Sequence, residues 1–371
     1  MSKQILLLKE EFRNKQIFLF GFPFWKRKSI KQMFELLNNK NTHFVNKSDL
    51  VNKYKNSHET IFVLWSMNLP ELVSNEKCTV YRLEDGFIRS KKLGSDLTVP
   101  YSLVLDKVGI YFNPLIDSGL EKILNTHELT AKEREESDRL LRIILTNNIS
   151  KYNSQKHIDY QDKIDKKYKK IKLVIGQVSD DASIKYGANE IRSNLELLEA
   201  VYTKSEDTDF IIFKPHPDVV SGNRAGCVAT NIALEYCNIV EESISLPSLL
   251  NIPNIEVHTI SSLSGFENLL RGNTTICYGN PFYAGWGATT DLYIPKEIKN
   301  RRQKKRSPLE ILYCAYIEYP IYFDLNNHKI ENVFKIIDII RNQKPFKETF
   351  FLKFRRKIVF LFKKLLKGIH V

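Results

Sequence analysis

Four short polar clusters of this sequence each follow an apolar run that predicts a β-strand. In the first, Glu84-Asp85-Gly86 comes directly after the strand predicted at residues 79–83. Two adjacent acids at a strand end, next to a glycine that lets the chain turn sharply, suit a nucleophile or a general base. The alternative is an ordinary acidic turn between a strand and a loop.

The second cluster centres on a histidine. His216 lies between two prolines and two residues after Lys214, just beyond the strand predicted at residues 209–213. The prolines restrict the backbone around the imidazole, which could then bind a phosphate or protonate a leaving group. The alternative is a histidine whose hydrogen bonds are satisfied within a tight loop.

The third cluster is rich in hydroxyl groups. Ser261, Ser262 and Ser264 lie where the strand predicted at residues 255–259 leads into the helix predicted at residues 264–270. Hydroxyl groups and unpaired backbone N–H groups at a helix N-terminus favour an anion site. The alternative is a simple N-cap provided by Ser264.

The fourth cluster and one aromatic loop are candidates for substrate contacts. Gln177 and Asp181 lie at the end of the strand predicted at residues 172–178, where they would face a ligand, or would simply cap a turn into the next helix. The loop at residues 279–287 is rich in glycine and aromatic residues. It is a possible substrate loop with Tyr283 and Trp286, or a buried plug.

The elements that must position these clusters form two α/β halves. Predicted strands alternate with helical segments, which is typical of parallel α/β units. The strands are predicted at residues 16–22, 60–65, 79–83 and 102–106 in the first half, and at residues 172–178, 209–213, 255–259 and 274–278 in the second. The polar, lysine-rich stretch at residues 150–170 reads as a connection between the halves.

This pattern predicts an α/β fold with two Rossmann-like domains facing a central cleft, because ligands of open α/β sheets bind at the carboxyl ends of the strands. The predicted domains are residues 1–165 and 166–300. C-terminal helices are predicted at residues 301–345, followed by a basic tail at residues 346–371.

The net charge of +13 is concentrated in two places. The tail has a net charge of +7 and the cluster at residues 301–306 adds +5, so the remaining body is almost neutral. This distribution argues against a nucleic-acid-binding face on the globular part. At helical spacing, residues 350–371 place apolar and basic side chains on opposite sides, which favours an anionic membrane surface as partner. The alternative is a terminal helix that packs on the body.

Cysteine spacing and hydropathy predict a cytoplasmic protein. The five cysteines are widely spaced, without a CxxC pair or a zinc-type cluster, so we expect reduced thiols and no metal site. The apolar stretch near the N-terminus is too short for a signal peptide, and no segment is apolar enough over about 18 residues to span a bilayer.

Taken together, the clusters resemble a known family. Three of them resemble the three short motifs of bacterial sialyltransferases, which use CMP-activated sugars in a two-Rossmann (GT-B) fold. The motifs are acid-Asp-Gly at residues 84–86, His-Pro at residues 216–217 and Ser-Ser at residues 261–262. Longer strings resemble the capsule polysaccharide biosynthesis family of the KpsC and LipB type. They are residues 81–90, 93–97, 176–178, 180–184, 213–219, 262–267, 270–272, 281–287 and 289–291. The likeness runs from about Gly21 to Tyr322 and departs at Ser179, where the family usually has an acid.

The resemblance implies a β-Kdo glycosyltransferase that uses CMP-Kdo and needs no cofactor or metal. It implies Asp85 as the nucleophile, because a β-linked donor and a β-linked product mean retention, with Glu84 orienting it or assisting proton transfer. His216 with Lys214 would assist departure of the CMP phosphate. The remaining donor-binding residues would be Gln177, Asp181, Ser261, Ser262, Ser264 and Glu267.

The implied acceptor is a glycan or glycolipid, and the implied location is the cytoplasmic face of the inner membrane. KpsC-type members often carry two such modules in one chain, whereas this sequence has room for one. Two other functions stay open at this point. One is a transferase of another CMP-activated sugar such as a sialic acid, and the other is a non-catalytic, membrane-bound assembly factor.

Overall fold

The computed structural model describes residues 3–45, 59–67, 79–91, 97–151, 158, 160, 164–165 and 167–343. The predicted basic tail lies outside these residues, as does most of the predicted connection around residue 155. The chain divides into two compact units. The first comprises residues 1–140 and 310–343, and the second comprises residues 141–309 and 344–371. No helix of the described ranges is long and apolar enough to cross a membrane.

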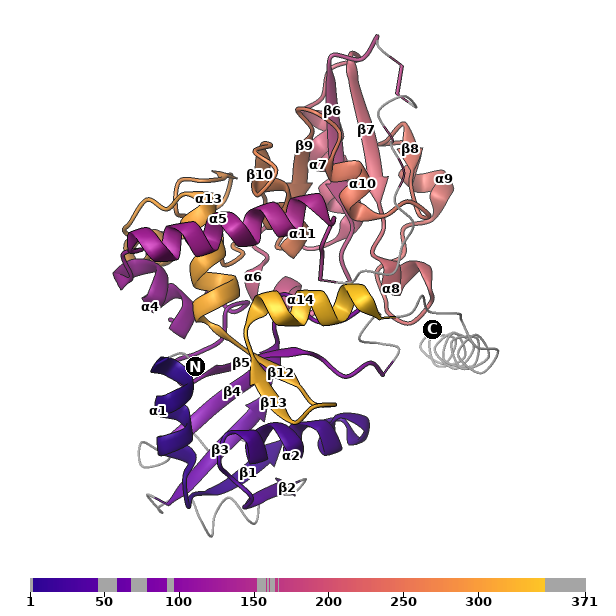
Figure 1. The fold of residues 1–371 in the computed structure, drawn as a ribbon. Helices are drawn as coiled ribbons and strands as arrows, with labels where there is room; N and C mark the ends of the chain where they lie inside the picture. The colour runs from indigo at the N-terminus through magenta and orange to yellow at the C-terminus, as the bar shows by residue number, and fades with distance from the viewer. Residues whose placement is uncertain are drawn as a thin grey trace, which may run out of the picture. The chain divides into compact units, whose positions relative to one another are not determined.

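The first unit is built on a seven-stranded mixed sheet (Figure 1), with the order β13-β12-β5-β4-β3-β1-β2. Its strands are β1 (Gln16–Phe20), β2 (Thr42–Val45), β3 (Thr60–Trp65), β4 (Thr79–Asp85), β5 (Ser102–Asp106), β12 (Pro320–Asp324) and β13 (Lys329–Glu331). Strands β2, β1, β3 and β4 are parallel neighbours, whereas β5, β12 and β13 continue the sheet in antiparallel fashion.

Alternation along the strands buries both faces of this sheet. On β1, Ile17 and Leu19 pack with helices α1 and α2, while Phe18 and Phe20 belong to a cluster on the other face. The helical elements assigned wholly or partly to this unit are α1 (Lys3–Phe12), η1 (Phe24–Lys26), α2 (Arg27–Leu36), α4 (Gly119–Thr126), α5 (Ala131–Thr146), α13 (Pro308–Leu312), the π-helix η5 (Tyr313–Glu318) and α14 (Val333–Asn342).

The second unit contains a six-stranded sheet whose neighbouring strands are all parallel, with the order β11-β10-β9-β6-β7-β8. Its strands are β6 (Lys170–Ile175), β7 (Asp209–Lys214), β8 (Ile239–Val240), β9 (Glu256–Thr259), β10 (Thr275–Cys277) and β11 (Thr290–Asp291). Read from β8, this is the 3-2-1-4-5-6 order of a Rossmann fold, whose order reverses between β6 and β9.

Helices cover both faces of the second sheet. Leu197 and Val201 of α7 pack with Phe213 on one face, and Leu249 and Leu250 of α10 pack on the other. The helices of this unit are α6 (Ala182–Gly187), α7 (Asn194–Thr203), α8 (Pro217–Val220), α9 (Thr230–Ala233), α10 (Leu246–Leu250), α11 (Leu263–Leu269) and α12 (Lys296–Arg301). The prediction of a mixed α/β fold with two Rossmann-like sheets is therefore confirmed.

Two details of the predicted organisation need correction. Residues 301–345 were expected to be helical, but β12 and β13 lie within them and join the first sheet (yellow strands in Figure 1). The division between the units falls after Leu140, within α5, rather than after residue 165. The first difference arises because the chain returns to the first sheet after it completes the second.

Candidate functional site

The first cluster of the candidate site is the end of β4. The strand is longer than predicted, because Glu84 pairs with Val104 and Asp85 with Leu103 of β5. Gly86 follows directly, and a Cβ atom at this position would lie 2.4 Å from the Ser102 Oγ atom. A glycine is therefore required where the chain leaves the strand, and Asp85 is fixed as the last residue of β4.

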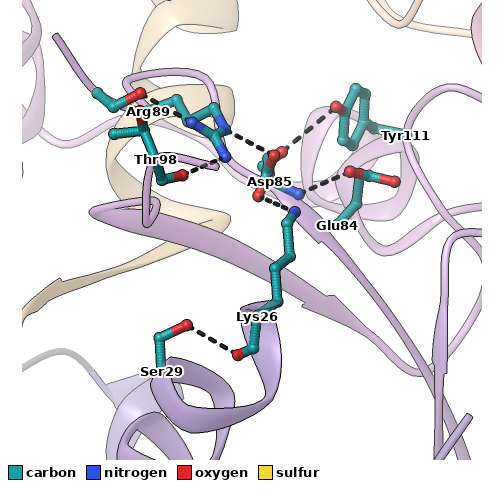
Figure 2. Close-up of polar contacts among 8 residues, drawn as sticks. Lys26, Ser29, Glu84, Asp85, Arg89, Thr98 and Tyr111 are labelled. Carbon is teal, nitrogen blue, oxygen red and sulfur yellow. Dashed lines mark hydrogen bonds and ion pairs between the residues drawn. The ribbon is translucent and has the colours of Figure 1, made fainter. Parts of the chain in front are cut away.

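The carboxylate of Asp85 lies between two cations (Figure 2). Its Oδ1 atom is 3.0 Å from Lys26 Nζ, and its Oδ2 atom is 2.6 Å from Arg89 Nε. The Asp85 side chain is 13% exposed, so the two ion pairs are only weakly screened by water. Two neighbouring cations stabilise the negative charge of the carboxylate, which suits a nucleophile better than a proton acceptor.

Arg89 is held rigidly. Its side chain is fully buried and donates hydrogen bonds to the Thr98 carbonyl oxygen and to Ser90 Oγ, both at 2.8 Å. The guanidinium group thus has partners on several sides, and the Asp85 Oδ2 atom is kept in one position.

Lys26 reaches Asp85 from the other side. It ends η1, the turn that follows β1, and its ammonium nitrogen lies 3.5 Å from the centre of the Trp65 ring at the end of β3. Burial lowers the pKa of Lys26, and the nearby Asp85 and Glu84 oppose this shift. The carboxyl ends of β1, β3 and β4 therefore meet in one polar cluster.

Glu84 contacts the backbone of its neighbour. Its Oε1 atom accepts a hydrogen bond of 2.9 Å from the Asp85 N–H group (Figure 2). The Tyr111 hydroxyl donates to the Asp85 carbonyl oxygen at 3.4 Å. Both contacts fix the backbone at Asp85.

In the second unit, Gln177 links the ends of β6 and β9. Its side-chain oxygen accepts from the Ser261 N–H group at 2.9 Å, and its amide donates to Ser261 Oγ at 3.2 Å. Both residues are buried. The link lies at the point where the strand order reverses, which is where Rossmann sheets bind ligands. The structure thus brings these two predicted residues together, with their polar groups engaged on each other.

The serines that follow β9 cap α11. Ser262 rather than Ser264 is the N-cap residue, and its Oγ atom accepts from the Ser264 N–H group at 3.2 Å. Ser262 also donates to Ser264 Oγ at 3.0 Å. Ser262 was missed as the cap because the helix begins one residue before the predicted start.

Asp181 is the N-cap of α6. It accepts from the backbone N–H group of Ser183 at 2.9 Å and from its hydroxyl at 2.7 Å. The geometry is that of the capped turn considered from the sequence. The charge of Asp181 also opposes the lowering of the His216 pKa by burial.

His216 is the N-cap of α8. Its Nδ1 atom accepts from the Asp218 N–H group at 3.0 Å, which leaves the proton of the neutral ring on Nε2. Burial lowers the pKa of His216, although Asp218 and Asp181 oppose the shift. A neutral imidazole with an Nε2–H group can donate a hydrogen bond to a phosphate oxygen near neutral pH.

Lys214 and Glu267 are both buried. The Lys214 ammonium group donates to the Glu242 carbonyl oxygen at 3.0 Å, and burial lowers its pKa to about 8. Burial raises the pKa of Glu267, which accepts hydrogen bonds from Ser150 Oγ and from the Lys151 N–H group. Each side chain is therefore engaged with its own unit.

The aromatic loop is packed inside the second unit. Tyr283 is 0% exposed and donates a hydrogen bond to the Ser262 carbonyl oxygen, and Trp286 is 1% exposed and donates to the Phe282 carbonyl oxygen. This placement corresponds to the buried plug. The Tyr283 hydrogen bond supports the turn that holds Ser262.

Two residues of the first cluster were missed by sequence reasoning. Lys26 and Arg89 are the cations that hold Asp85, yet they lie 59 residues before it and 4 residues after it. The available signal was position, because Lys26 follows β1 just as Asp85 ends β4, and carboxyl ends of parallel strands share one sheet edge. Among the described residues, no group of three His, Cys, Asp or Glu side chains is arranged to hold a metal ion.

Comparison with known proteins agrees with the fold and with the motifs. The chain is 36% identical over 333 residues to the capsule polysaccharide modification protein LipA of Neisseria meningitidis serogroup B. The alignment covers 89% of this chain and 46% of LipA, so the chain spans less than half the length of that relative. It is also 34% identical to the lipopolysaccharide-processing protein LpsZ of Rhizobium meliloti, over 70% of this chain and 59% of LpsZ.

Two solved structures of Thermosulfurimonas dismutans KpsC are similar. One, described as a beta Kdo 2,7 transferase, has a TM-score of 0.70 and 31% identity and covers 89% of this chain and all of its own. The other, described as a beta Kdo 2,4 transferase, has a TM-score of 0.71 and 28% identity, with 88% and 98% covered. These matches confirm the predicted GT-B-like α/β fold class. The model of the capsule polysaccharide biosynthesis family matches residues 69–322, and because that is more than half of the chain, the chain belongs to this family.

Proposed function

We propose that this chain is a retaining β-Kdo glycosyltransferase. It transfers Kdo from CMP-β-Kdo to a saccharide acceptor, lipid-linked in the cell, during synthesis of a capsule or another surface polysaccharide. The observation that carries the proposal is the carboxylate of Asp85, which lies between Lys26 and Arg89 at the carboxyl end of β4. Family membership and the likeness to two Kdo transferases support it.

The proposed reaction is a double displacement. In the first step, an Asp85 carboxylate oxygen attacks the anomeric carbon of Kdo, and the bond to the CMP phosphate breaks with its electron pair on the phosphate oxygen. A glycosyl ester of Asp85 results. In the second step, an acceptor hydroxyl attacks the same carbon, Glu84 takes the hydroxyl proton, and the Asp85 carboxylate is released. Two inversions give net retention.

The second unit supplies nucleotide binding in this proposal. The N-terminus of α11 with Ser261 and Ser262 binds the phosphate, and the Nε2–H group of His216 donates to it as its charge grows. Because burial lowers the pKa of His216, we assign it hydrogen bonding to the departing phosphate rather than full proton transfer.

The test uses CMP-Kdo with a synthetic Kdo-terminated glycolipid. Asp85→Ala should abolish transfer, and NMR of the wild-type product should show a β-linkage. Intact-protein mass spectrometry without acceptor should detect a Kdo adduct, located on Asp85 by peptide mapping. Asp338→Asn, an exposed carboxylate of α14, is the matched control and should transfer normally. Undiminished transfer by Asp85→Ala would rule out the assignment.

We also propose peripheral attachment to an anionic membrane surface through residues 350–371. This part of the proposal rests on the sequence alone, because the tail lies outside the described residues. Deletion of residues 350–371 should release the protein from anionic vesicles in a flotation assay while transfer to a soluble acceptor continues. Loss of folding on deletion would favour the packed-helix alternative.

A further inference from the structure

Lys26 has bonding capacity that the Asp85 ion pair does not use. Its ammonium group has three N–H donors, and the Asp85 Oδ1 atom is its one oxygen partner within the described part of the chain. A face of the Trp65 ring covers it at 3.5 Å. An anion that approaches Asp85 can therefore be received by Lys26 without breaking another hydrogen bond.

Lys26 loses the carboxylate charge that it contacts when Asp85 is esterified. Lys26 and Arg89 oppose the carboxylates of Asp85 and Glu84, so formation of a glycosyl ester on Asp85 removes one negative charge. Lys26 is 5% exposed, and an unpaired ammonium group at that burial is strongly unfavourable. A covalent intermediate with a neutral sugar would leave Lys26 without the carboxylate that it contacts within the described residues.

A 2-keto acid sugar supplies another carboxylate by its own chemistry. Its carboxylate is bonded to the anomeric carbon, so it arrives beside the ester as the ester forms. Arg89 is anchored to Thr98 and Ser90 and contacts the Oδ2 atom, whereas Lys26 donates to the Oδ1 atom at 3.0 Å. We take the Oδ1 atom as the attacking oxygen, because Lys26 lies directly beside it and has N–H donors to spare.

We propose that Lys26 binds the carboxylate of the donor sugar and that it selects 2-keto acid sugars over neutral ones. This inference rests on the proposed function. As the Asp85 Oδ1 atom bonds to the anomeric carbon and CMP departs, the ammonium group exchanges its partner from Asp85 to the sugar carboxylate. It returns to Asp85 when the acceptor displaces the ester. Lys26 stays protonated throughout, so no proton is gained or lost in the exchange.

The experiment compares two donors, CMP-Kdo and its C1-carboxamide analogue, on wild-type protein and on Lys26→Met, with kcat/KM as the readout. Wild type should prefer CMP-Kdo by about 100-fold, the size expected for a buried charge pair that loses one partner. Lys26→Met should lower kcat/KM for CMP-Kdo by a similar factor and remove the preference. Lys28→Met, an exposed neighbour, is the matched control and should keep it.

Lys26→Gln retains an N–H donor for Asp85 without the charge, and it gives the same comparison if Lys26→Met does not fold. Equal losses with both donors, leaving the preference intact, would mean that Lys26 only positions Asp85 and would overturn the inference. Equal kcat/KM values of the wild-type protein for the two donors would overturn the inference about Lys26 but not the proposed transfer. A wild type inactive with CMP-Kdo would overturn the proposed function and this inference with it.

Discussion

At the residue scale, the two cations beside Asp85 differ in how they are held, and this difference separates their roles. Arg89 is fully buried and donates hydrogen bonds to Asp85, Ser90 and Thr98, whereas the oxygen that Lys26 contacts among the described residues is Asp85 Oδ1, beside the Trp25 and Trp65 rings. A rigid cation fixes one carboxylate oxygen, and a less constrained one leaves the other oxygen available. This asymmetry is what a nucleophile with a defined direction of attack requires.

Arg89→Met should destabilise the first unit by about 3 to 5 kcal/mol, because it removes one partner of a buried ion pair and the donor to Ser90 Oγ and to the Thr98 carbonyl oxygen. Urea unfolding followed by circular dichroism measures this loss. Arg341→Met on α14, whose ion pair is exposed, is the control and should change stability by less than about 0.5 kcal/mol. Equal effects of the two variants would contradict the structural role of Arg89.

The lowered pKa of the buried Lys214 leads us to expect that the stability of the second unit depends on pH. Its pKa falls from 10.5 in an unfolded chain to about 8 in the fold. Between these values the unfolded state binds the extra proton, so the contribution of this group to folding stability rises with pH. The cost of burying the charge is fully present below about pH 8 and is relieved toward pH 10.5.

Lys214→Met removes this dependence. Between pH 7.5 and pH 9.5, the unfolding free energy of wild type should therefore rise by roughly 2 kcal/mol relative to Lys214→Met. Chemical denaturation at several pH values measures the difference, and Lys185→Met, an exposed lysine on α6, serves as the control. A difference that stays constant with pH would contradict the lowered pKa.

Sequence reasoning singled out Asp85 and His216 as candidates because both come at the end of recognisable strands. It did not locate Lys26 and Arg89, because their contact with Asp85 depends on which strands are neighbours in the sheet. The phosphate contact expected of Lys214 stays a prediction, and the structure adds that its ammonium group donates to the Glu242 carbonyl oxygen. Strand ends can be read from a sequence, but the direction of a long side chain depends on packing that the local pattern does not contain.

At the element scale, the positions of the strands could be predicted from the apolar runs. Whether neighbouring strands are parallel or antiparallel could not. The predicted bounds of β3 and β5 match the structure, because both strands are almost wholly buried. The antiparallel pairing of β4 with β5 was missed, since an apolar run reads the same in either direction. The short strands β2, β8 and β11 were missed because they are less buried and carry little apolar pattern.

The junction of β4 and β5 gives an element-scale prediction. Gly86→Ala should destabilise the protein by about 2 kcal/mol, because the new Cβ atom would lie 2.4 Å from Ser102 Oγ and 2.8 Å from Ser102 Cβ. The strand end would have to shift, so transfer should fall as well. Thermal unfolding and an activity assay measure the two effects.

Removal of the Ser102 side chain tests the cause of this effect. In the background of Gly86→Ala, Ser102→Gly removes both close contacts. Its effect on the free energy of unfolding should therefore be more favourable there than in wild type. Additive effects of the two substitutions would show that the clash is not responsible. Gly272→Ala is a useful contrast, because no atom lies within 4 Å there and its cost should come from the positive φ of 76° alone.

At the scale of the whole molecule, the first unit is discontinuous in sequence, since residues 310–343 return to complete the sheet begun by residues 16–106. This return could not be predicted from the local pattern, because β12 is a short apolar run that is equally compatible with part of a buried helix. The proposed chemistry is divided between the units in the same way, with the nucleophile in the first and nucleotide binding in the second.

This division can be tested by hydrogen exchange with mass spectrometry. CMP alone should slow amide exchange at residues 176–184 and 260–268, where the ends of β6 and β9 are linked through Gln177, and leave residues 84–90 unchanged. CMP-Kdo without acceptor should in addition change exchange at residues 84–90, because an ester on Asp85 alters the ion pairs that fix this turn. In Asp85→Ala the response to CMP should persist and the second change should disappear. Protection of residues 84–90 by CMP alone would contradict the division, since it would place nucleotide binding in the first unit.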